Sequence, residues 1–279
     1  MPRPNIAQAI KAATDTLAET SASARLDAEV LLRHALECSA THLLAWPEKT
    51  LDEKQALNFE QLIEQRRSGV PVAYLTGHKE FWSLDFRVTP ATLIPRPETE
   101  LLVEFVLDKF SSRKKLKLID LGTGSGAIAV ALAGEKPDWD ITATDVSEEA
   151  LAVATENARR HQISNIQFIK SHWFEQIEPQ GFDLIISNPP YIARHDAHLS
   201  QGDVRFEPPG ALISGDTGMD AIEHITSQAK RHLSRDGWLI FEHGYDQKQA
   251  LYDCLSRHHF QHIIQREDLS AQPRITAGR

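Results

Sequence analysis

Apolar residues recur at helical spacing over roughly the first seventy residues. Leu26, Val30 and Leu31 illustrate the pattern, in which apolar side chains return every three or four positions and so fall on one face of a helix. Runs of β-branched residues, which favour strands, are few in this stretch. The pattern predicts a small helical bundle over residues 1–70.

The stretch 71–97 differs in composition. It is rich in glycine, proline and aromatic residues, and it contains two short β-prone segments, 80–85 and 85–89. Glycine and proline interrupt helices and favour turns, so we expect a β-hairpin linker here.

From residue 98 onward helical and strand-like segments alternate. This alternation is typical of right-handed βαβ units, which build a parallel sheet. The predicted helices cover 98–110, 127–133, 148–161 and 219–232; the predicted strands cover 115–120, 140–145, 166–169, 182–187, 238–242, 260–266 and 273–277. Residues 98–279 are therefore predicted to form an α/β domain, with a long loop after the fourth strand.

The composition indicates a folded protein with no general affinity for nucleic acid. Of 279 residues, 41% are hydrophobic and 25% are charged, which is ordinary for a globular protein. Thirty basic against 39 acidic residues give a formal net charge of -9. Such a chain does not attract phosphate backbones in general, so we expect a protein partner and no direct nucleic acid contact.

The cysteine content and the lack of long apolar runs indicate in which cellular compartment the protein is expected. Cys38 and Cys254 are too few for a disulfide framework and suit a reducing compartment. The first twenty residues lack the apolar core of a signal peptide, and the most apolar run, 127–133, is too short to cross a bilayer. We expect a cytoplasmic protein without membrane association, and a monomer.

A glycine-rich turn follows the first predicted strand. It comprises Gly122, Thr123, Gly124, Ser125 and Gly126, and a helix begins directly after it. Glycines let a ligand approach the backbone closely, and a helix start offers N–H groups to a carboxylate. Taken alone the turn is weak evidence, because such turns also serve only to connect a strand to a helix.

Asp145 strengthens the prediction of a cofactor site. It ends the second predicted strand, where its carboxylate can accept both hydroxyls of a ribose. The Gly-x-Gly-x-Gly spacing differs from the Gly-x-Gly-x-x-Gly of dinucleotide dehydrogenases. The cofactor predicted is therefore S-adenosyl-L-methionine, with S-adenosyl-L-homocysteine as product. Trp173, after the third strand, is expected beside the adenine, although an indole there is also typical of a core.

The run Asn188, Pro189, Pro190, Tyr191 follows the fourth predicted strand, and open α/β sheets bind ligands at the carboxyl ends of their strands. An amide nitrogen is a poor nucleophile because its lone pair is delocalised. The Asn188 side-chain oxygen and the Pro189 carbonyl can accept both hydrogens of an NH2 group, and the prolines keep these oxygens rigid. Tyr191 offers a flat face to a planar acceptor. The run predicts methyl transfer to a planar nitrogen, with Asn188 also close to the cofactor, although Asn-Pro opens ordinary turns as well.

With these motifs in place, the chain resembles the release-factor glutamine methyltransferases, the HemK family, along nearly its full length. The resemblance is carried by Arg67, Gly69, Pro71, Tyr74, Gly77, Phe81, Leu93–Glu100, Asp120–Gly126, Asn188–Tyr191, Asp203–Pro208, Glu242–Gly244 and Thr276–Arg279. One departure is His172, where relatives usually carry aspartate, so His172 is left out of the expected cofactor contacts.

The resemblance implies an amino-terminal helical domain that docks the protein substrate. It also implies a Rossmann-like class I methyltransferase domain with a seven-stranded, mostly parallel sheet whose last strand is antiparallel. The implied product is N5-methylglutamine in the Gly-Gly-Gln motif of peptide chain release factors. Composition and spacing by themselves indicate only a nitrogen methyltransferase with an acidic accessory domain.

Three alternatives remain open. DNA adenine-N6 methyltransferases share the Asn-Pro-Pro-Tyr chemistry, but the acidic net charge and the lack of a basic recognition region count against them. A glutamine methyltransferase acting on a ribosomal protein would use the same pocket, and the run Arg96–Glu100 favours the release factor. A protein that only senses S-adenosylmethionine would not need an intact acceptor motif.

Several other residues have weaker claims to a role. Cys254, His258 and His262 are spaced as metal ligands on a helix, but the predicted strand 260–266 breaks that helix, so no metal site is predicted. Two interpretations stay open for the charged residues at the start of the predicted helix 98–110. They are either ordinary capping and solvated charges or contacts to the substrate; the residues are Arg96, Glu98 and Glu100. Arg205 and Glu207, in the long loop, are candidates for contact with a release factor.

Overall fold

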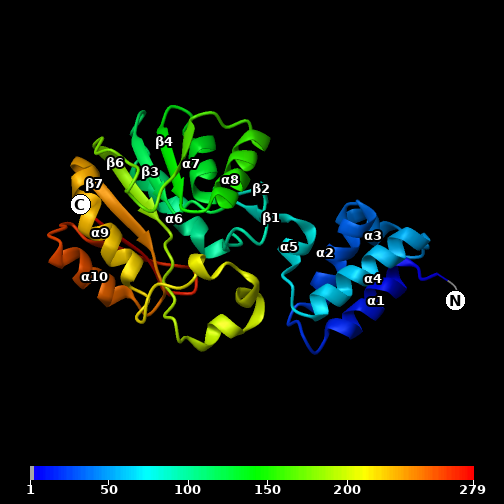
Figure 1. Ribbon diagram of the computed structural model, residues 1–279. Coiled ribbons are helices and arrows are strands. Elements are labelled where there is room, and N and C mark those ends of the chain that lie inside the picture. The colour runs from blue at the N-terminus through cyan, green and yellow to red at the C-terminus, as the bar shows by residue number, and fades with distance from the viewer. Residues whose placement is uncertain (1–2) are drawn as a thin grey trace. The chain divides into compact units, whose positions relative to one another are not determined.

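The amino-terminal helices begin where the sequence supplies capping side chains. In the computed structural model, which describes residues 3–279, Asn5 and Gln8 cap α1 reciprocally, and Asp52 and Gln55 do the same for α4. The helices are α1 (Ile6–Leu17), α2 (Ala24–Leu36), α3 (Ala40–Ala45), α4 (Glu53–Arg67) and α5 (Val72–Thr76) (Figure 1).

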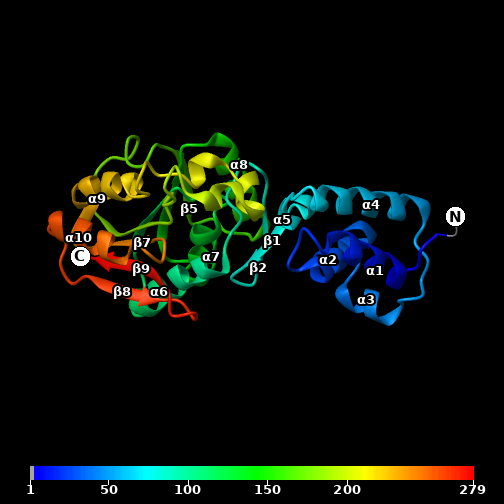
Figure 2. The ribbon, with the colours of Figure 1, turned by 90° about the horizontal axis from the view of Figure 1, so that it is seen from below.

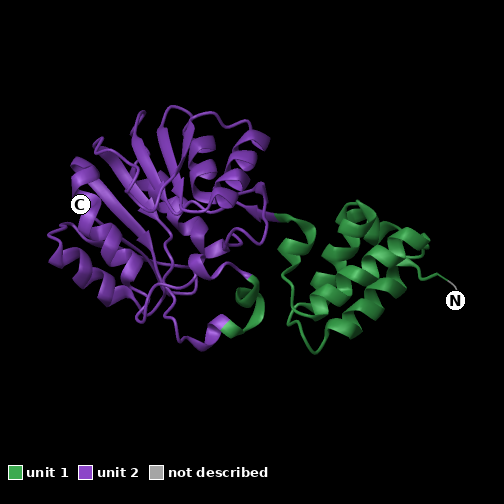
Figure 3. Cartoon of the chain, viewed as in Figure 1, with its two compact units in different colours: residues 1–78, 200–206 green, residues 79–199, 207–279 purple. Residues whose placement is uncertain are grey.

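These helices enclose a hydrophobic core of their own, which includes Leu17, Leu31, Leu32 and Phe59. They belong to a compact unit made of residues 1–78 and 200–206 (Figure 3). The predicted helical bundle is confirmed. The sequence pattern did not predict that a segment distant along the chain completes this unit.

Arg66 joins the distant segment to the bundle. Its guanidinium donates to Asp27 at 2.7 Å and to Asp203 at 2.8 Å, and its side chain is largely buried. Arg205 donates to the main-chain oxygen of Ser68 at 2.9 Å. Gly69 permits this approach, because a Cβ there would lie 1.7 Å from the Arg205 guanidinium. The segment 200–206 is thus fixed to the helices by charge-assisted hydrogen bonds.

Residues 79–199 and 207–279 form the second unit, built on a seven-stranded sheet. The strand order is β5-β4-β3-β6-β7-β9-β8, in which β9 runs antiparallel to both of its neighbours and the other neighbouring pairs are parallel. The strands are β3 (Lys117–Leu121), β4 (Asp140–Asp145), β5 (Ile166–Lys170), β6 (Phe182–Ser187), β7 (Leu233–Glu242), β8 (Ile264–Glu267) and β9 (Pro273–Gly278). The expectation of a mostly parallel sheet with an antiparallel last strand is confirmed.

The pleat of the sheet divides its apolar side chains between two cores. Leu118 and Ile186 face a cluster that contains residues of α6 and α7, whereas Ile119 and Ile185 face one that contains residues of α9 and α10. Helices therefore cover both faces, as buried parallel strands require (Figures 1 and 2). The helices are α6 (Glu100–Lys109), α7 (Ala127–Glu135), α8 (Glu148–Arg160), α9 (Asp220–His232) and α10 (Lys248–Arg257).

The linker and the carboxyl-terminal part differ in detail from the prediction. A two-stranded sheet, β1 (His78–Phe81) and β2 (Leu84–Arg87), occupies the linker, but α5 precedes it. Helix α10 was not predicted, and β8 begins four residues later than expected. The long loop contains three short 3-10 helices, at Ala197–Ser200, Gly202–Phe206 and Pro209–Ala211.

Candidate functional site

A cavity of about 760 Å³ lies where the loops after β3, β4, β5 and β6 converge. This position, beyond the carboxyl ends of parallel strands, is where open α/β sheets bind ligands, and the volume suits a nucleoside-sized molecule. Its wall includes the following residues predicted for the site: Gly122, Thr123, Gly124, Ser125, Asp145, Trp173, Asn188 and Pro190. Gly126, Pro189 and Tyr191 are not among the residues that line it.

The glycine-rich turn is held in shape by the neighbouring strand. The N–H groups of Gly122 and Thr123 both donate to the carbonyl of Thr144, at 2.9 and 2.8 Å. The N–H of Gly124 donates to the Asp145 carboxylate at 2.9 Å. These N–H groups therefore brace the turn, and the three glycines adopt positive φ angles that favour glycine.

Gly126 has a packing role. It precedes α7, and a Cβ there would lie 3.0 Å from the Cβ of Ala154 on α8. Its lack of a side chain lets the two helices approach closely. Gly126 is not among the residues that line the cavity, and its contact with the cofactor stays a prediction.

Asp145 lies at the junction of two backbone segments. Its Oδ2 accepts the N–H of Gly124 and its Oδ1 accepts the N–H of Ser147, both at 2.9 Å. Burial raises the pKa of this carboxyl, while those backbone donors lower it. Asp145 lines the cavity, so the acceptor capacity of its carboxylate that these backbone donors leave unused is available to a ligand hydroxyl.

Trp173 lines the cavity after β5. It has a positive φ of 52°, and a Cβ on Gly122 would lie 3.4 Å from its ring, so the indole lies against the glycine-rich turn. His172 also lines the cavity, with Nδ1 3.0 Å from the Glu175 carboxylate. His172 was left out of the expected contacts, and the structure adds it to the cavity wall.

Asn188 is the first residue after β6, and its side chain is tied to the start of α6. Its Nδ2 lies 3.2 Å from the Thr99 hydroxyl oxygen, to which it donates. With the nitrogen engaged in this way, Oδ1 is the amide atom that remains for an incoming N–H. Ser187, one residue earlier, donates its hydroxyl to the carbonyl of Leu121 at 2.7 Å, which fixes the end of β6 to β3.

Buried contacts stabilise the rest of the acceptor run, the name used here for Asn188–Tyr191. Pro189 is buried, and burial raises the pKa of Tyr191 to about 12. The main-chain oxygen of Tyr191 accepts a hydrogen bond from Gln247 at 3.0 Å. A Cβ on Gly218 would lie 2.3 Å from that same oxygen. Sequence reasoning missed Gln247 and Gly218, which lie far from the run along the chain.

Two buried carboxyls adjoin the site. Asp120 accepts the Thr123 hydroxyl at 2.6 Å, but its Oδ1 has no hydrogen-bond partner. Glu242, at the end of β7, likewise has an unpartnered Oε2. Burial raises the pKa of each to about 7. The sequence signal for Glu242 is an acid that ends an apolar strand, and Glu242 is also one of the residues that carry the family resemblance.

The segment 91–99 forms another part of the wall, through Leu93, Arg96, Thr99 and their neighbours. Arg96 donates to both carboxylate oxygens of Glu207 at 2.7 Å, and the Glu207 side chain is fully buried. The pair ties this segment to the loop that follows the acceptor run. Glu207 therefore stabilises the loop and does not present its carboxylate to a protein partner.

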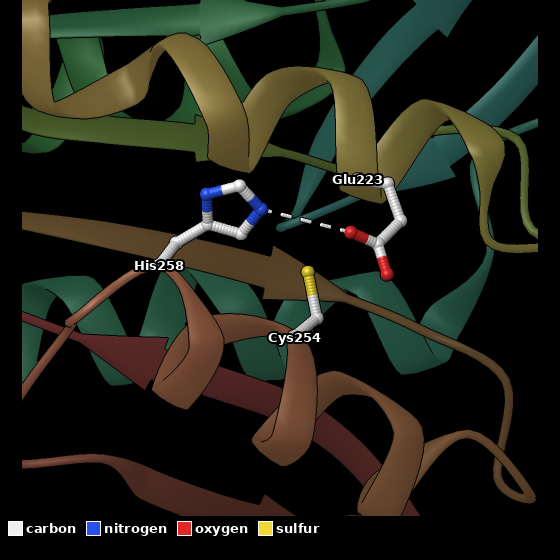
Figure 4. A group of neighbouring side chains, drawn as sticks. All are labelled: Glu223, Cys254 and His258. Carbon is white, nitrogen blue, oxygen red and sulfur yellow. Dashed lines mark ion pairs between the residues drawn. The ribbon is translucent and has the colours of Figure 1, made fainter.

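Of the suggested metal ligands, the structure brings together Cys254 and His258 with Glu223, whereas His262 is not part of the group (Figure 4). The three ligand atoms lie within 4.8 Å of one another. Glu223 is paired with Arg257, and burial raises the pKa of Cys254 to about 11, so its thiol is protonated at neutral pH. Ion pairing and burial account for this group without a metal.

Within residues 3–279, no helix is both long and apolar enough to span a membrane.

Comparison with known proteins agrees with this geometry. Residues 8–77 match the family described as PrmC N-terminal domain, and residues 97–205 match the methyltransferase small domain. The release factor glutamine methyltransferase of Vibrio cholerae is 47% identical over 275 residues, which cover 98% of this chain and 96% of that protein.

Two solved structures share the fold at lower identity. The ribosomal protein L11 methylase of Lactobacillus delbrueckii subsp. bulgaricus is 23% identical, with a TM-score of 0.51, over 70% of this chain and 84% of that one. The N-terminal domain of human METTL16, solved in complex with SAH, is 21% identical, with a TM-score of 0.50, over 71% and 76%.

Proposed function

Because the chain belongs to the release factor glutamine methyltransferase family, we propose that it methylates the Gly-Gly-Gln motif of peptide chain release factors. The methyl group passes from S-adenosyl-L-methionine to N5, the side-chain amide nitrogen of the glutamine. S-adenosyl-L-homocysteine and one proton leave with the methylated product.

The observation that carries this proposal is the orientation of Asn188. Its Nδ2 is engaged by Thr99 in the wall of the cavity that also contains the glycine-rich turn and Asp145. Oδ1 can then accept one hydrogen of a glutamine NH2 group, with the Pro189 carbonyl as the second acceptor. Two fixed acceptors orient the nitrogen lone pair and stabilise the positive charge that develops on nitrogen during transfer.

The residues present fit S-adenosylmethionine, which when bound supplies an electrophilic methyl on a sulfonium. Asp145 would accept the ribose hydroxyls, since it lines the cavity at the end of β4 and a carboxylate offers several acceptor positions. Trp173 would pack against the adenine, and its ring lies against the glycine-rich turn, at Gly122, whose positive φ of 74° favours glycine. The cavity volume of about 760 Å³ is sufficient for this ligand.

The unit formed by residues 1–78 and 200–206 is proposed to dock the release factor. It matches a family of its own, and it contains the exposed apolar residues Leu26, Leu44, Trp46 and Leu57. Exposed apolar side chains are a common feature of protein-binding surfaces. We further propose that the enzyme is a cytoplasmic monomer, which size-exclusion chromatography with light scattering would test.

The decisive experiment supplies methyl-labelled S-adenosylmethionine with a release factor, a ribosomal protein or DNA. We expect label on the Gly-Gly-Gln glutamine, located by mass spectrometry, and none on DNA. Asn188→Ala should lower turnover by about 100-fold, as loss of one transition-state acceptor typically does. Label on a ribosomal protein alone, or on adenine, would reject the proposed substrate.

A further inference from the structure

Glu242 lies in a position that is costly for a carboxyl. It is 2% exposed, and its Oε2 has no hydrogen-bond partner. Burying a polar group without a full set of partners costs stability, so a carboxyl here needs an explanation other than packing. That explanation must come from what lies beside it.

The sheet places Glu242 next to the acceptor run. In the parallel pairing of β6 and β7, Ser187 is opposite Phe241. The residues that follow these two positions, Asn188 and Glu242, therefore extend from adjacent strand ends. The acceptor amide and the buried carboxyl share one edge of the sheet.

Thr99 connects the two. It is buried, and its hydroxyl oxygen accepts the Asn188 Nδ2–H at 3.2 Å. Thr99 and Asn188 both lower the pKa of Glu242, against the rise caused by burial, so both side chains lie within reach of this carboxyl. A hydroxyl has a single proton, so once its oxygen accepts from Asn188 that proton is free to be donated to the carboxyl.

This arrangement discriminates between the two orientations of the Asn188 amide. With Nδ2 toward Thr99 and Glu242, the amide N–H groups face the Thr99 hydroxyl oxygen and the Glu242 carboxyl, both of which accept hydrogen bonds. If the amide were rotated by 180°, Oδ1 would face the Glu242 carboxyl, and the Nδ2 hydrogens would face an incoming NH2 group, donor against donor. Only the first orientation leaves an acceptor for the substrate.

We propose that Glu242 and Thr99 are positioning residues that hold Asn188 in the orientation able to accept a hydrogen bond from the glutamine substrate. Neither contacts the reacting atoms in this role; both act through the Asn188 amide. The inference rests on the proposed function and adds two residues to its mechanism.

The test compares two pairs of variants on a Gly-Gly-Gln peptide. Thr99→Val and Glu242→Met remove the hydrogen-bonding groups while keeping similar shapes, whereas Thr99→Ser and Glu242→Gln keep a hydroxyl and an acceptor oxygen. We expect kcat to fall about tenfold or more in the first pair, with the Kd for S-adenosylmethionine within about twofold of wild type. The second pair should restore most of that loss.

Stability measurements separate positioning from folding. Glu242→Met removes a buried carboxyl, so it should lose turnover without a matching loss in Tm. The inference is overturned if Thr99→Val and Glu242→Met keep wild-type kcat, or if the loss of kcat in all four variants simply follows their loss of Tm. A wild-type enzyme that does not methylate glutamine would instead reject the proposed function.

Discussion

At the scale of single residues, Asp145 illustrates how one side chain serves both the fold and a ligand. Its two oxygens accept the Gly124 and Ser147 N–H groups, and the residue also lines the cavity. The sequence predicted the ligand contact from the position of an acid at a strand end. It did not predict that the acid also shapes the glycine-rich turn, because that contact joins segments 21 residues apart.

Asp145→Ala should weaken binding of S-adenosylmethionine by about 10- to 100-fold, because two hydrogen bonds to a charged group are lost. Titration calorimetry measures the Kd. Asp140→Ala, at the exposed opposite end of β4, is the matched control and should leave the Kd unchanged. Equal affinity of the Asp145 variant and wild type would remove Asp145 from the cofactor site.

The residues that sequence reasoning missed share one property. Thr99, Gln247 and Gly218 contact the acceptor run only through the tertiary fold, since Thr99 is 89 residues from Asn188 and Gln247 is 56 residues from Tyr191. A motif is visible when its members are adjacent along the chain. These supports come from other elements and have no shared spacing to detect.

At the scale of elements, most of the sheet was predictable because its strands are continuous apolar runs that alternate with helices. The sequence pattern did not predict helix α10, because the helix contains only three buried residues, Leu251, Cys254 and Leu255, among polar ones. The first residues of β7 were not predicted as strand for a similar reason, since Ser234, Arg235 and Asp236 are not apolar. Where burial covers only part of an element, periodicity is too weak to identify it.

The contact between Gly218 and Tyr191 gives a prediction at this scale. Gly218→Ala should destabilise the protein by about 3 kcal/mol and lower activity, because Gly218 has a positive φ of 79° and a Cβ would meet the Tyr191 oxygen. Urea denaturation measures the change.

Gly202→Ala is its control, because Gly202 also has a positive φ but nothing lies within 4 Å of a Cβ there. It should cost about 1 kcal/mol. If both substitutions cost the same, steric contact with the acceptor run is not the cause.

The pair formed by Arg96 and Glu207 allows an asymmetric prediction. The Glu207 side chain is fully buried, whereas that of Arg96 is 31% exposed. Arg96→Met removes the guanidinium nitrogen that donates to both oxygens of this buried carboxylate, and should cost about 3 kcal/mol or more. Glu207→Gln leaves a guanidinium that water reaches, so it should cost less. Chemical denaturation of both variants checks the order, and the reverse order would contradict this account.

At the scale of the whole molecule, the buried carboxyls make stability depend on pH. Burial raises the pKa of Asp120 and of Glu242 to about 7, above their values in the unfolded chain. The folded state therefore binds these protons more tightly than the unfolded state. Their contribution to stability is complete below about pH 4 and is lost as pH rises through about 7.

Glu242→Gln removes one of these titrations. The free energy of unfolding of wild type, relative to this variant, should fall by about 3 kcal/mol between pH 4 and pH 8. Urea denaturation across that range measures the difference. Asp236→Asn, an exposed position on the same strand, should show no such trend. A relative stability that does not change with pH would mean that Glu242 titrates normally.

The contact of Arg66 with both Asp27 and Asp203 has a consequence for synthesis. Asp203 is translated 137 residues after Arg66, which at about 5 to 20 residues per second is a delay of roughly 7 to 27 seconds. The nascent helices can assemble in that interval with Arg66 held by Asp27 alone. The first unit to leave the ribosome therefore stays incomplete until a segment encoded in the second half of the message, residues 200–206, has been translated.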